Sequence, residues 1–199
     1  MSQIERLGFA AVAIILWFIS QKFLGKRVSS ADSEIRDHVH LLTAKINTHL
    51  HSNTKLANFF IISSSFIIDA LTAGMLIWSV LGPSVKPLVC MFILFFLRQL
   101  NQTITQLPTP KNMIWRNPGF PSIFVTYKVS NDLFFSGHTA LATLAALQLI
   151  SFGNIFLSAL AILILAYEVV VVLILRAHWT MDVFTGAVTA ILVYELVSL

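Results

Sequence analysis

The sequence predicts an all-α membrane protein with six transmembrane helices and one additional amphipathic helix at the membrane interface. First, 57% of the 199 residues are hydrophobic and only 11% are charged, whereas about a quarter of the residues of a soluble domain are charged. Second, six apolar stretches approach the roughly 20 residues that a helix needs to cross a bilayer. Third, a polar segment between the first two stretches has helical periodicity. We expect a single domain over residues 1–199.

The apolar stretches cover residues 7–24, 57–81, 85–107, 134–151, 154–175 and 179–198. A cleaved signal peptide is the alternative for the first stretch. However, a signal peptide carries its positive charge first and a small-residue cleavage site afterwards. Here the heavier charge follows, at Lys22, Lys26 and Arg27, and no such cleavage site comes after it. We therefore expect a retained helix.

The polar segment, residues 25–55, predicts the interfacial helix. Its apolar residues recur at spacings of four, three, four and four, which places them on one helical face: Ile35, Val39, Leu42, Ile46 and Leu50.

Four histidines of this segment, at positions 38, 40, 49 and 51, raise the alternative of a metal site. A spacing of two does not bring two side chains to one helical face, and no cysteine or carboxylate completes a ligand set. We expect these histidines to be solvated, and we expect neither a metal nor another cofactor.

The connection at about 108–133 contains four of the six prolines, which exclude a continuous helix. A connection of this length in a compact protein is usually functional or disordered. Its aromatic residues favour an ordered structure at the interface, and its basic residues are available to phosphate groups. These are Trp115, Phe120, Phe124 and Tyr127, with Lys111, Arg116 and Lys128.

Two histidines outside the polar segment are expected on the same side of the membrane. His138 opens the fourth apolar stretch, and His178 follows the fifth. Two crossings return the chain to the side that it left. His178 and Asp182 are four residues apart and share one helical face, so the carboxylate can hold one imidazole nitrogen and raise the basicity of the other. Ser136 and Gly137 precede His138 at a helix N-terminus, which favours bound anions.

These residues carry a resemblance to a known group of enzymes. Ser136-Gly137-His138, followed by His178-x-x-x-Asp182, resembles the type 2 phosphatidic acid phosphatase superfamily. DLFFSGHT at 132–139 resembles the signature of sphingomyelin synthases. RAHWTMD at 176–182 and LRQLNQTITQLPTP at 97–110 are similar to plant enzymes that move phosphocholine from phosphatidylcholine to diacylglycerol. The likeness covers about residues 95–190.

The resemblance implies roles for individual residues. His178 is the expected nucleophile toward phosphorus, Asp182 orients it, and His138 protonates the departing lipid alcohol. Substrate-binding roles are expected for Ser136, Gly137, Arg98, Arg176, Asp132 and Glu168.

The chain also departs from the phosphatase pattern. Val171-Val172 stand where the phosphatases have Ser-Arg, and the first phosphatase motif, a lysine followed seven residues later by Arg-Pro, is absent. Those cations serve a phosphate monoester, which is close to a dianion at neutral pH. A phosphodiester carries one charge, so the departures favour transfer of a diester headgroup, with Arg176 or Arg98 supplying a cation.

Plainer interpretations stand beside these. A Ser-Gly-His string is also a helix cap followed by a surface histidine, and Arg176 is also a residue type that anchors helices at an interface. Asp69 and Glu168 lie inside apolar stretches, where a carboxylate is costly. They either contact a cationic headgroup or pair with polar neighbours such as Ser63–Ser65 or Tyr167.

The sequence thus predicts an enzyme, a lipid headgroup transferase without a cofactor. Its expected substrates are phosphatidylcholine and diacylglycerol, with ceramide as the other acceptor, and the reaction proceeds through a phospho-histidine. The alternatives are a lipid phosphate phosphatase of the same superfamily and a non-catalytic lipid-binding protein. We expect a multi-pass integral membrane protein, in the endoplasmic reticulum or another endomembrane of a eukaryote or the inner membrane of a bacterium. No run of basic residues indicates nucleic acid, and the oligomeric state is left open.

Overall fold

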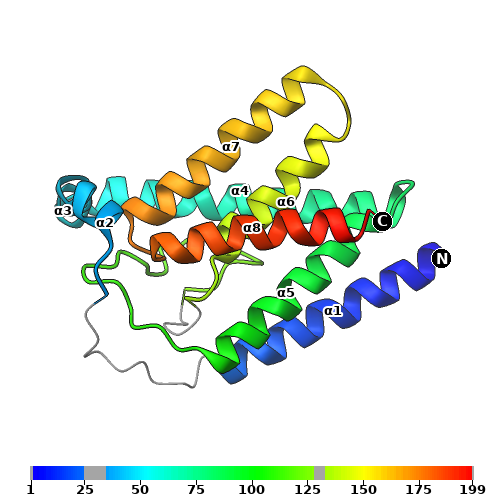
Figure 1. Ribbon diagram of the computed structural model, residues 1–199, viewed down its shortest axis with the longest axis horizontal. Helices are drawn as coiled ribbons and strands as arrows, with labels where there is room; N and C mark the ends of the chain where they lie inside the picture. The colour runs from blue at the N-terminus through cyan, green and yellow to red at the C-terminus, as the bar shows by residue number, and fades with distance from the viewer. Residues whose placement is uncertain (1, 25–34, 128–132, 199) are drawn as a thin grey trace.

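The computed structural model describes residues 2–24, 35–127 and 133–198, and within them the chain forms eight α-helices and no strands. Figure 1 shows α4 and α8 running through the middle of the molecule, α1 beside α5, and α6 and α7 rising together as a hairpin. The helices are α1 (Gln3–Leu24), α2 (His38–Leu42), α3 (Ala44–Ser52), α4 (Thr54–Leu81), α5 (Lys86–Ile104), α6 (Gly137–Ile150), α7 (Ile155–Ile174) and α8 (Thr180–Leu196).

All six apolar stretches are helical, but only four of the described helices are long and apolar enough to cross a membrane: α1, α4, α5 and α7. The prediction of six spans is therefore corrected to four candidate spans, which indicate membrane association. α6 has 14 residues and α8 has 17. At 1.5 Å per residue these helices extend about 21 and 26 Å, less than the roughly 30 Å of a hydrocarbon core.

α6 is the central helix of the fold. Its residues from Thr139 to Ala146 are all buried, and it packs against α4, α5, α7 and α8. Ser136 caps its N-terminus, because the Ser136 hydroxyl accepts a hydrogen bond from the Thr139 amide at 3.3 Å. A short connection, with Gly153 at a φ of +70° and Asn154 as the cap of α7, returns the chain. His138 is thereby fixed at one end of the buried helix.

The polar segment forms two short helices, not one. Thr43 ends α2 and precedes α3, so the predicted single stripe is interrupted. Leu42 and Ile46 are exposed, whereas His40, Asn47 and Leu50 are buried. The Asn47 amide donates to the Ile174 carbonyl at 2.9 Å. The α2–α3 segment is thus packed on the C-terminal end of α7, next to RAHWTMD at 176–182, which we call the second motif. Some of the apolar side chains of the segment face outward.

Two polar side chains fasten peripheral parts of the chain to α4. Arg6 of α1 donates to the carbonyl oxygens of Ser79 and Gly82 at 3.3 and 2.8 Å, at the end of α4 where helix carbonyls lack partners within the helix. Asp69, in the middle of α4, accepts hydrogen bonds from the Ser122 hydroxyl and from the Ile123 and Phe124 amides, each at 2.9 Å. Asp69 therefore holds the α5–α6 loop (residues 105–136) against α4.

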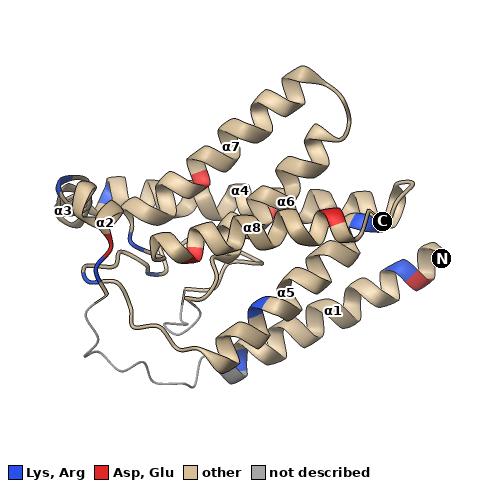
Figure 2. Ribbon diagram, in the orientation of Figure 1, with Lys and Arg blue, Asp and Glu red and all other residues tan. Residues whose placement is uncertain are grey.

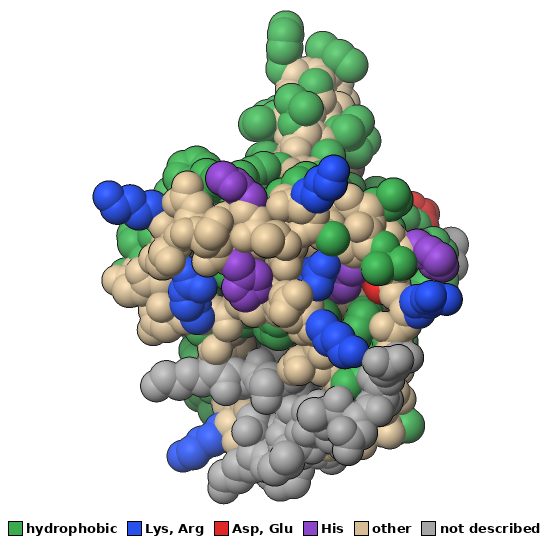
Figure 3. Space-filling model, turned by 90° about the vertical axis from the view of Figure 1, so that its left-hand side faces the viewer, with side chains coloured by type: hydrophobic (Ala, Val, Ile, Leu, Met, Phe, Trp, Pro, Cys, Tyr) green, Lys and Arg blue, Asp and Glu red, His purple; other side chains and the backbone are tan. Residues whose placement is uncertain are grey.

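Charge is distributed unevenly over the fold. Figure 2 shows long stretches of helix without a charged residue. Figure 3 shows Lys, Arg and His side chains gathered on the face at the α2–α3 end. A basic face of this kind suits contact with anionic or zwitterionic lipid headgroups. The exposed basic residues of the elements at this end are Arg36, His38, Lys45, His49, His51, Lys55, Lys111 and Arg116.

Candidate active site

One cavity contains both motif histidines. It encloses about 540 Å³ of empty space, including its open mouth, and its walls come from α1, α4, α5, the α5–α6 loop, α6 and the α7–α8 connection (residues 175–179). The structure thus brings His138 and His178 together. The lining residues are Trp17, Gln21, Ile68, Phe95, Arg98, Met113, Trp115, Phe124, Val125, Thr126, Gly137, His138, Leu141, Ala177 and His178.

His178 is held through its Nδ1 atom. Nδ1 lies 3.0 Å from the Leu133 carbonyl oxygen and 3.4 Å from Asp182 Oδ2. A carbonyl oxygen only accepts hydrogen bonds, so Nδ1 carries the proton and Nε2 keeps a free lone pair. Asp182 is fully buried, and its Oδ2 also accepts from the Trp179 amide at 3.0 Å. The predicted His178–Asp182 pair is present, but the closer acceptor is the backbone of Leu133.

His138 offers the cavity a nitrogen that the protein does not use. Its Nε2 atom is buried and has no hydrogen-bond partner among the described residues. The ring stands edge-on to Trp115, with ring centroids 5.2 Å apart and an interplanar angle of 88°. The Trp115 indole is itself fixed, because its N–H donates to the Thr126 carbonyl at 3.1 Å. A buried polar nitrogen without a partner is unfavourable, so a substrate group that bonds to Nε2 is favoured.

Arg98 supplies a cation to the same cavity. It is buried on α5, and its Nε donates to the Phe135 carbonyl at 2.9 Å. Gly137 lies directly against it, since a Cβ atom at this position would lie 3.4 Å from Arg98 Nε. The guanidinium thus lies beside the N-terminus of α6, with no side chain of residue 137 between them. The amides and the positive end of that helix add to the anion-binding potential.

Backbone contacts join Ser136-Gly137-His138 to the second motif. The Ser136 amide donates to the Asp182 carbonyl at 3.0 Å. Gly186, one turn after Asp182, permits this approach, because a Cβ there would lie 2.7 Å from the Ser136 carbonyl oxygen. Sequence reasoning missed Gly186, although its spacing of four from Asp182 was a signal. The Ser136 side chain caps α6 and is not part of the cavity wall.

Two other predicted substrate-binding residues, Arg176 and Glu168, are not in the cavity wall. Arg176 donates from Nη1 to the Lys111 carbonyl at 2.7 Å and from Nη2 to the His40 carbonyl at 3.0 Å. Glu168 is buried between α7 and α4 and accepts from the Ser64 hydroxyl at 2.6 Å. This contact matches the plainer interpretation of Glu168. Asp132 lies outside the described residues. Arg98 is therefore the better placed of the two candidate cations.

His40 was expected to be solvated, and this expectation is wrong. It is 5% exposed, its Nε2 donates to the His178 carbonyl at 3.0 Å, and its ring stacks on Trp179 with centroids 5.3 Å apart. Asp37 adds a second link, because its carboxylate accepts from the amide and the hydroxyl of Thr180 at 2.7 and 2.8 Å. The α2 segment thus braces the backbone of the second motif. The sequence feature that could have predicted these contacts is the pair of polar residues at positions 37 and 40, one helical turn apart.

No acidic side chain is among the described residues of the cavity wall. The wall is instead rich in aromatic rings. Cation–π contact with such rings is one way in which proteins recognise quaternary ammonium groups. The described residues also contain no group of three or more His, Cys, Asp or Glu side chains placed to hold a metal ion. The aromatic residues are Trp17, Phe95, Trp115 and Phe124.

Comparison with protein families identifies one match, over residues 36–199, to the family described as AtPDCT1/2, which comprises phosphatidylcholine:diacylglycerol cholinephosphotransferase-like proteins. The matched range includes both motifs and every helix except α1. Comparisons with curated proteins and with solved structures found no significant match.

Proposed function

The chain belongs to the AtPDCT1/2 family, and on that premise we propose that it transfers phosphocholine from phosphatidylcholine to diacylglycerol through a covalent intermediate on His178. The observation that carries the proposal is the shared cavity. Among the described residues, it combines a nitrogen with a free lone pair, a second imidazole nitrogen without a partner, one guanidinium and a wall of aromatic rings.

In the first half of the proposed reaction, Nε2 of His178 attacks the phosphorus of phosphatidylcholine. A P–N bond forms and the bond from phosphorus to the diacylglycerol oxygen breaks. Protonated His138 gives its proton to the departing alkoxide from Nε2, so diacylglycerol leaves as the neutral alcohol. Burial and the neighbouring His178 and Arg98 lower the pKa of His138 to about 3. The negative charge of the bound phosphodiester acts in the opposite direction and favours protonated His138.

In the second half, a new diacylglycerol places its hydroxyl in the cavity. His138 now takes the hydroxyl proton, the oxygen attacks phosphorus and the P–N bond breaks. Phosphatidylcholine with the new acyl pair is released, and both histidines return to their starting states. Throughout, Asp182 lies 3.4 Å from Nδ1 of His178 and stabilises the positive charge that develops on the imidazole.

The two parts of the headgroup have separate partners in the cavity. Arg98 and the amides at the start of α6 fit the phosphate oxygens. The trimethylammonium group fits the rings of Trp115 and its aromatic neighbours, because the described residues of the wall include no carboxylate to receive it. A single guanidinium matches the single charge of a phosphodiester better than the double charge of a monoester.

The test uses purified protein in liposomes of phosphatidylcholine that contain diacylglycerol with a distinguishable acyl pair. Mass spectrometry then follows the choline headgroup. We expect the headgroup to appear on the new acyl pair. If ceramide replaces diacylglycerol with equal efficiency, the acceptor assignment is wrong. If instead free phosphate is released from phosphatidic acid and no headgroup moves, the protein is a phosphatase.

A further inference from the structure

α1 lies outside the range that matches the family, yet it contributes two polar side chains to the catalytic cavity, Trp17 and Gln21. Gln21 is 5% exposed, and its Oε1 atom has no hydrogen-bond partner among the described residues. The Trp17 indole nitrogen is likewise buried without a partner there. Two unpartnered polar atoms from one helix face are costly unless a ligand satisfies them.

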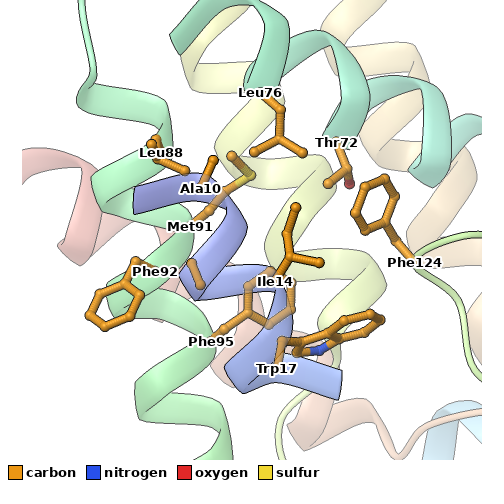
Figure 4. Close-up of a pocket in the computed structure, with 11 residues that line it drawn as sticks. Ala10, Ile14, Trp17, Thr72, Leu76, Leu88, Met91, Phe92, Phe95 and Phe124 are labelled. Carbon is orange, nitrogen blue, oxygen red and sulfur yellow. The ribbon is translucent and has the colours of Figure 1, made fainter. Parts of the chain in front are cut away.

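A second cavity adjoins the catalytic one. It encloses about 490 Å³, including its open side, between α1, α4 and α5, and Thr72 is the only residue with a polar side-chain oxygen in its described wall. Figure 4 shows the side chains of Ala10, Ile14 and Trp17 on α1 facing Met91 and Phe95 on α5. Three residues line both cavities, namely Trp17, Phe95 and Phe124. The two cavities therefore adjoin at these three shared side chains.

The position of α1 is well defined by packing. Phe9 contacts Phe92 with ring centroids 5.3 Å apart, and Trp17 contacts Phe95 and Phe124 at 6.1 and 6.4 Å. The residues of α1 that line the two cavities recur every three or four positions, which is one helical face. Along that face, α1 changes from small and apolar at Ala10 to polar at Gln21.

We propose that α1 forms the binding site of the acceptor lipid alcohol, with the hydroxyl of the lipid at Gln21 and one acyl chain in the apolar cavity that Ala10, Ile14 and Trp17 line. This inference rests on the proposed function. The assignment to the acceptor follows from the hydrogen-bonding chemistry. Gln21 Oε1 can only accept a hydrogen bond. A lipid alcohol has a hydroxyl that donates one, whereas phosphatidylcholine has no donor. The Trp17 N–H fits an ester carbonyl of the same lipid.

The test compares three α1 variants with matched controls in the transfer assay. Gln21→Leu and Trp17→Phe each remove one polar partner, and we expect each to raise KM for diacylglycerol about three- to tenfold, the effect of one net hydrogen bond. KM for phosphatidylcholine should change less. Ala13→Phe fills part of the apolar cavity and should raise KM for diacylglycerol as well. The controls make the same changes at the exposed positions Gln3 and Ala11, as Gln3→Leu and Ala11→Phe, and should match the wild type.

A binding measurement separates this inference from the proposed function. Diacylglycerol with a photoreactive group at the end of an acyl chain is activated in liposomes, and the labelled peptides are identified by mass spectrometry. Labels on the walls from α1, α4 and α5 that disappear in Ala13→Phe support the site, even if the wild type transfers no headgroup and the proposed function fails. Efficient transfer with labels elsewhere, or with an unchanged KM for diacylglycerol in all three variants, overturns the α1 site.

Discussion

At the scale of single residues, the two cavity histidines differ in how the protein constrains them. His178 has one nitrogen engaged by the Leu133 carbonyl, which leaves the other nitrogen free for attack. The Nε2 atom of His138 has no partner in the part of the chain that the structure describes, and its ring lies beside the fixed Trp115. A nucleophile needs a defined tautomer, whereas a group that alternates between acid and base needs an exchangeable proton. The two environments fit these two roles.

Gly137 provides a prediction at this scale. In Gly137→Ala, the new Cβ would be in ordinary van der Waals contact with Arg98, 3.4 Å from its Nε, and it would add a methyl group to the cavity wall at the start of α6. That methyl group keeps a phosphate from approaching the backbone closely. We expect kcat/KM for transfer to fall about 10- to 100-fold, because small displacements of a reacting group have effects of this order. The thermal unfolding temperature should change little. Gly8→Ala is the control, since a Cβ there meets nothing within 4 Å. Wild-type kinetics in Gly137→Ala would show that the phosphate does not approach the backbone at the start of α6.

Part of this arrangement was predictable from the sequence. The spacing of His178 and Asp182 indicated their contact. The prediction that His138 lies on their side assumed two membrane crossings, and α6 is too short to be a candidate span. His138 is nevertheless at the same end of the fold, because α6 and α7 form a hairpin (Figure 1). The Leu133 carbonyl and the burial of His40 were not predictable, because both depend on how the α5–α6 loop and the α2 segment fold back onto the second motif. These two contacts join residues that are 45 and 138 positions apart in the sequence, so no local sequence pattern predicts them.

At the scale of elements, the site depends on close packing of α6 against α8. Gly186 is the point of contact, because the Ser136 carbonyl occupies the space of a side chain there. The obstacle is backbone at the cap of a buried helix, so it cannot rotate away as a side chain would. The alignment of the two motifs therefore depends on one glycine.

Gly186→Ala should lower the free energy of unfolding in detergent by about 1–3 kcal/mol, the usual effect of overpacking, and should reduce transfer at the same time. Gly74→Ala, on an open part of α4 where a Cβ meets nothing within 4 Å, should be neutral or stabilising by up to about 1 kcal/mol. Equal stability of the two variants would exclude a tight α6–α8 contact.

The α2 segment gives a prediction about pH. Burial lowers the pKa of His40 below its usual 6.5, with Arg176 acting in the same direction and Asp37 and Asp182 against it. The unfolded chain therefore takes up a proton at His40 before the folded protein does. The contribution of His40 to the free energy of unfolding is therefore complete above about pH 6.5 and falls as the pH drops toward the pKa of His40 in the folded protein.

The pKa of Asp37 is also lowered, since hydrogen bonds from Thr180 outweigh the effect of burial, which acts to raise it. Its contribution to stability is therefore present above its ordinary pKa and is lost only at strongly acidic pH.

Between pH 7.5 and 5.5 the unfolding temperature in detergent should fall in the wild type and less in His40→Gln. His49→Gln, at an exposed position of α3, should behave as the wild type does. A wild-type slope in His40→Gln would contradict the bracing role of α2.

The locations of the long helices were predictable from hydrophobicity alone, and all six apolar stretches are helical. The number of membrane-spanning helices was not predictable in this way, because hydropathy does not distinguish a helix buried in protein from one buried in lipid. α6 is apolar since its neighbours are helices. The break at Thr43 was also missed. Asp37 caps α2 through hydrogen bonds from the Val39 and His40 amides, and the α2 helix that begins there has His40 on its buried face.

At the scale of the whole molecule, the catalytic cavity is a composite of distant parts of the chain. α5 provides the cation, α6 and the α7–α8 connection provide the histidines, and α1 and the α5–α6 loop close the space with aromatic rings. The basic face at the α2–α3 end (Figure 3) suits the headgroup region of a membrane. The fold thus brings the proposed nucleophile, His178, into one cavity with His138 and Arg98.

The central claim is that His178 carries the headgroup during transfer. The most direct measurement incubates the protein with choline-labelled phosphatidylcholine in the absence of diacylglycerol, quenches at alkaline pH and locates the label by peptide mass spectrometry. We predict phosphocholine on His178 in the wild type, its release when diacylglycerol is added, and no label in His178→Ala. Efficient transfer by His178→Ala, or a label on another residue, would contradict the account.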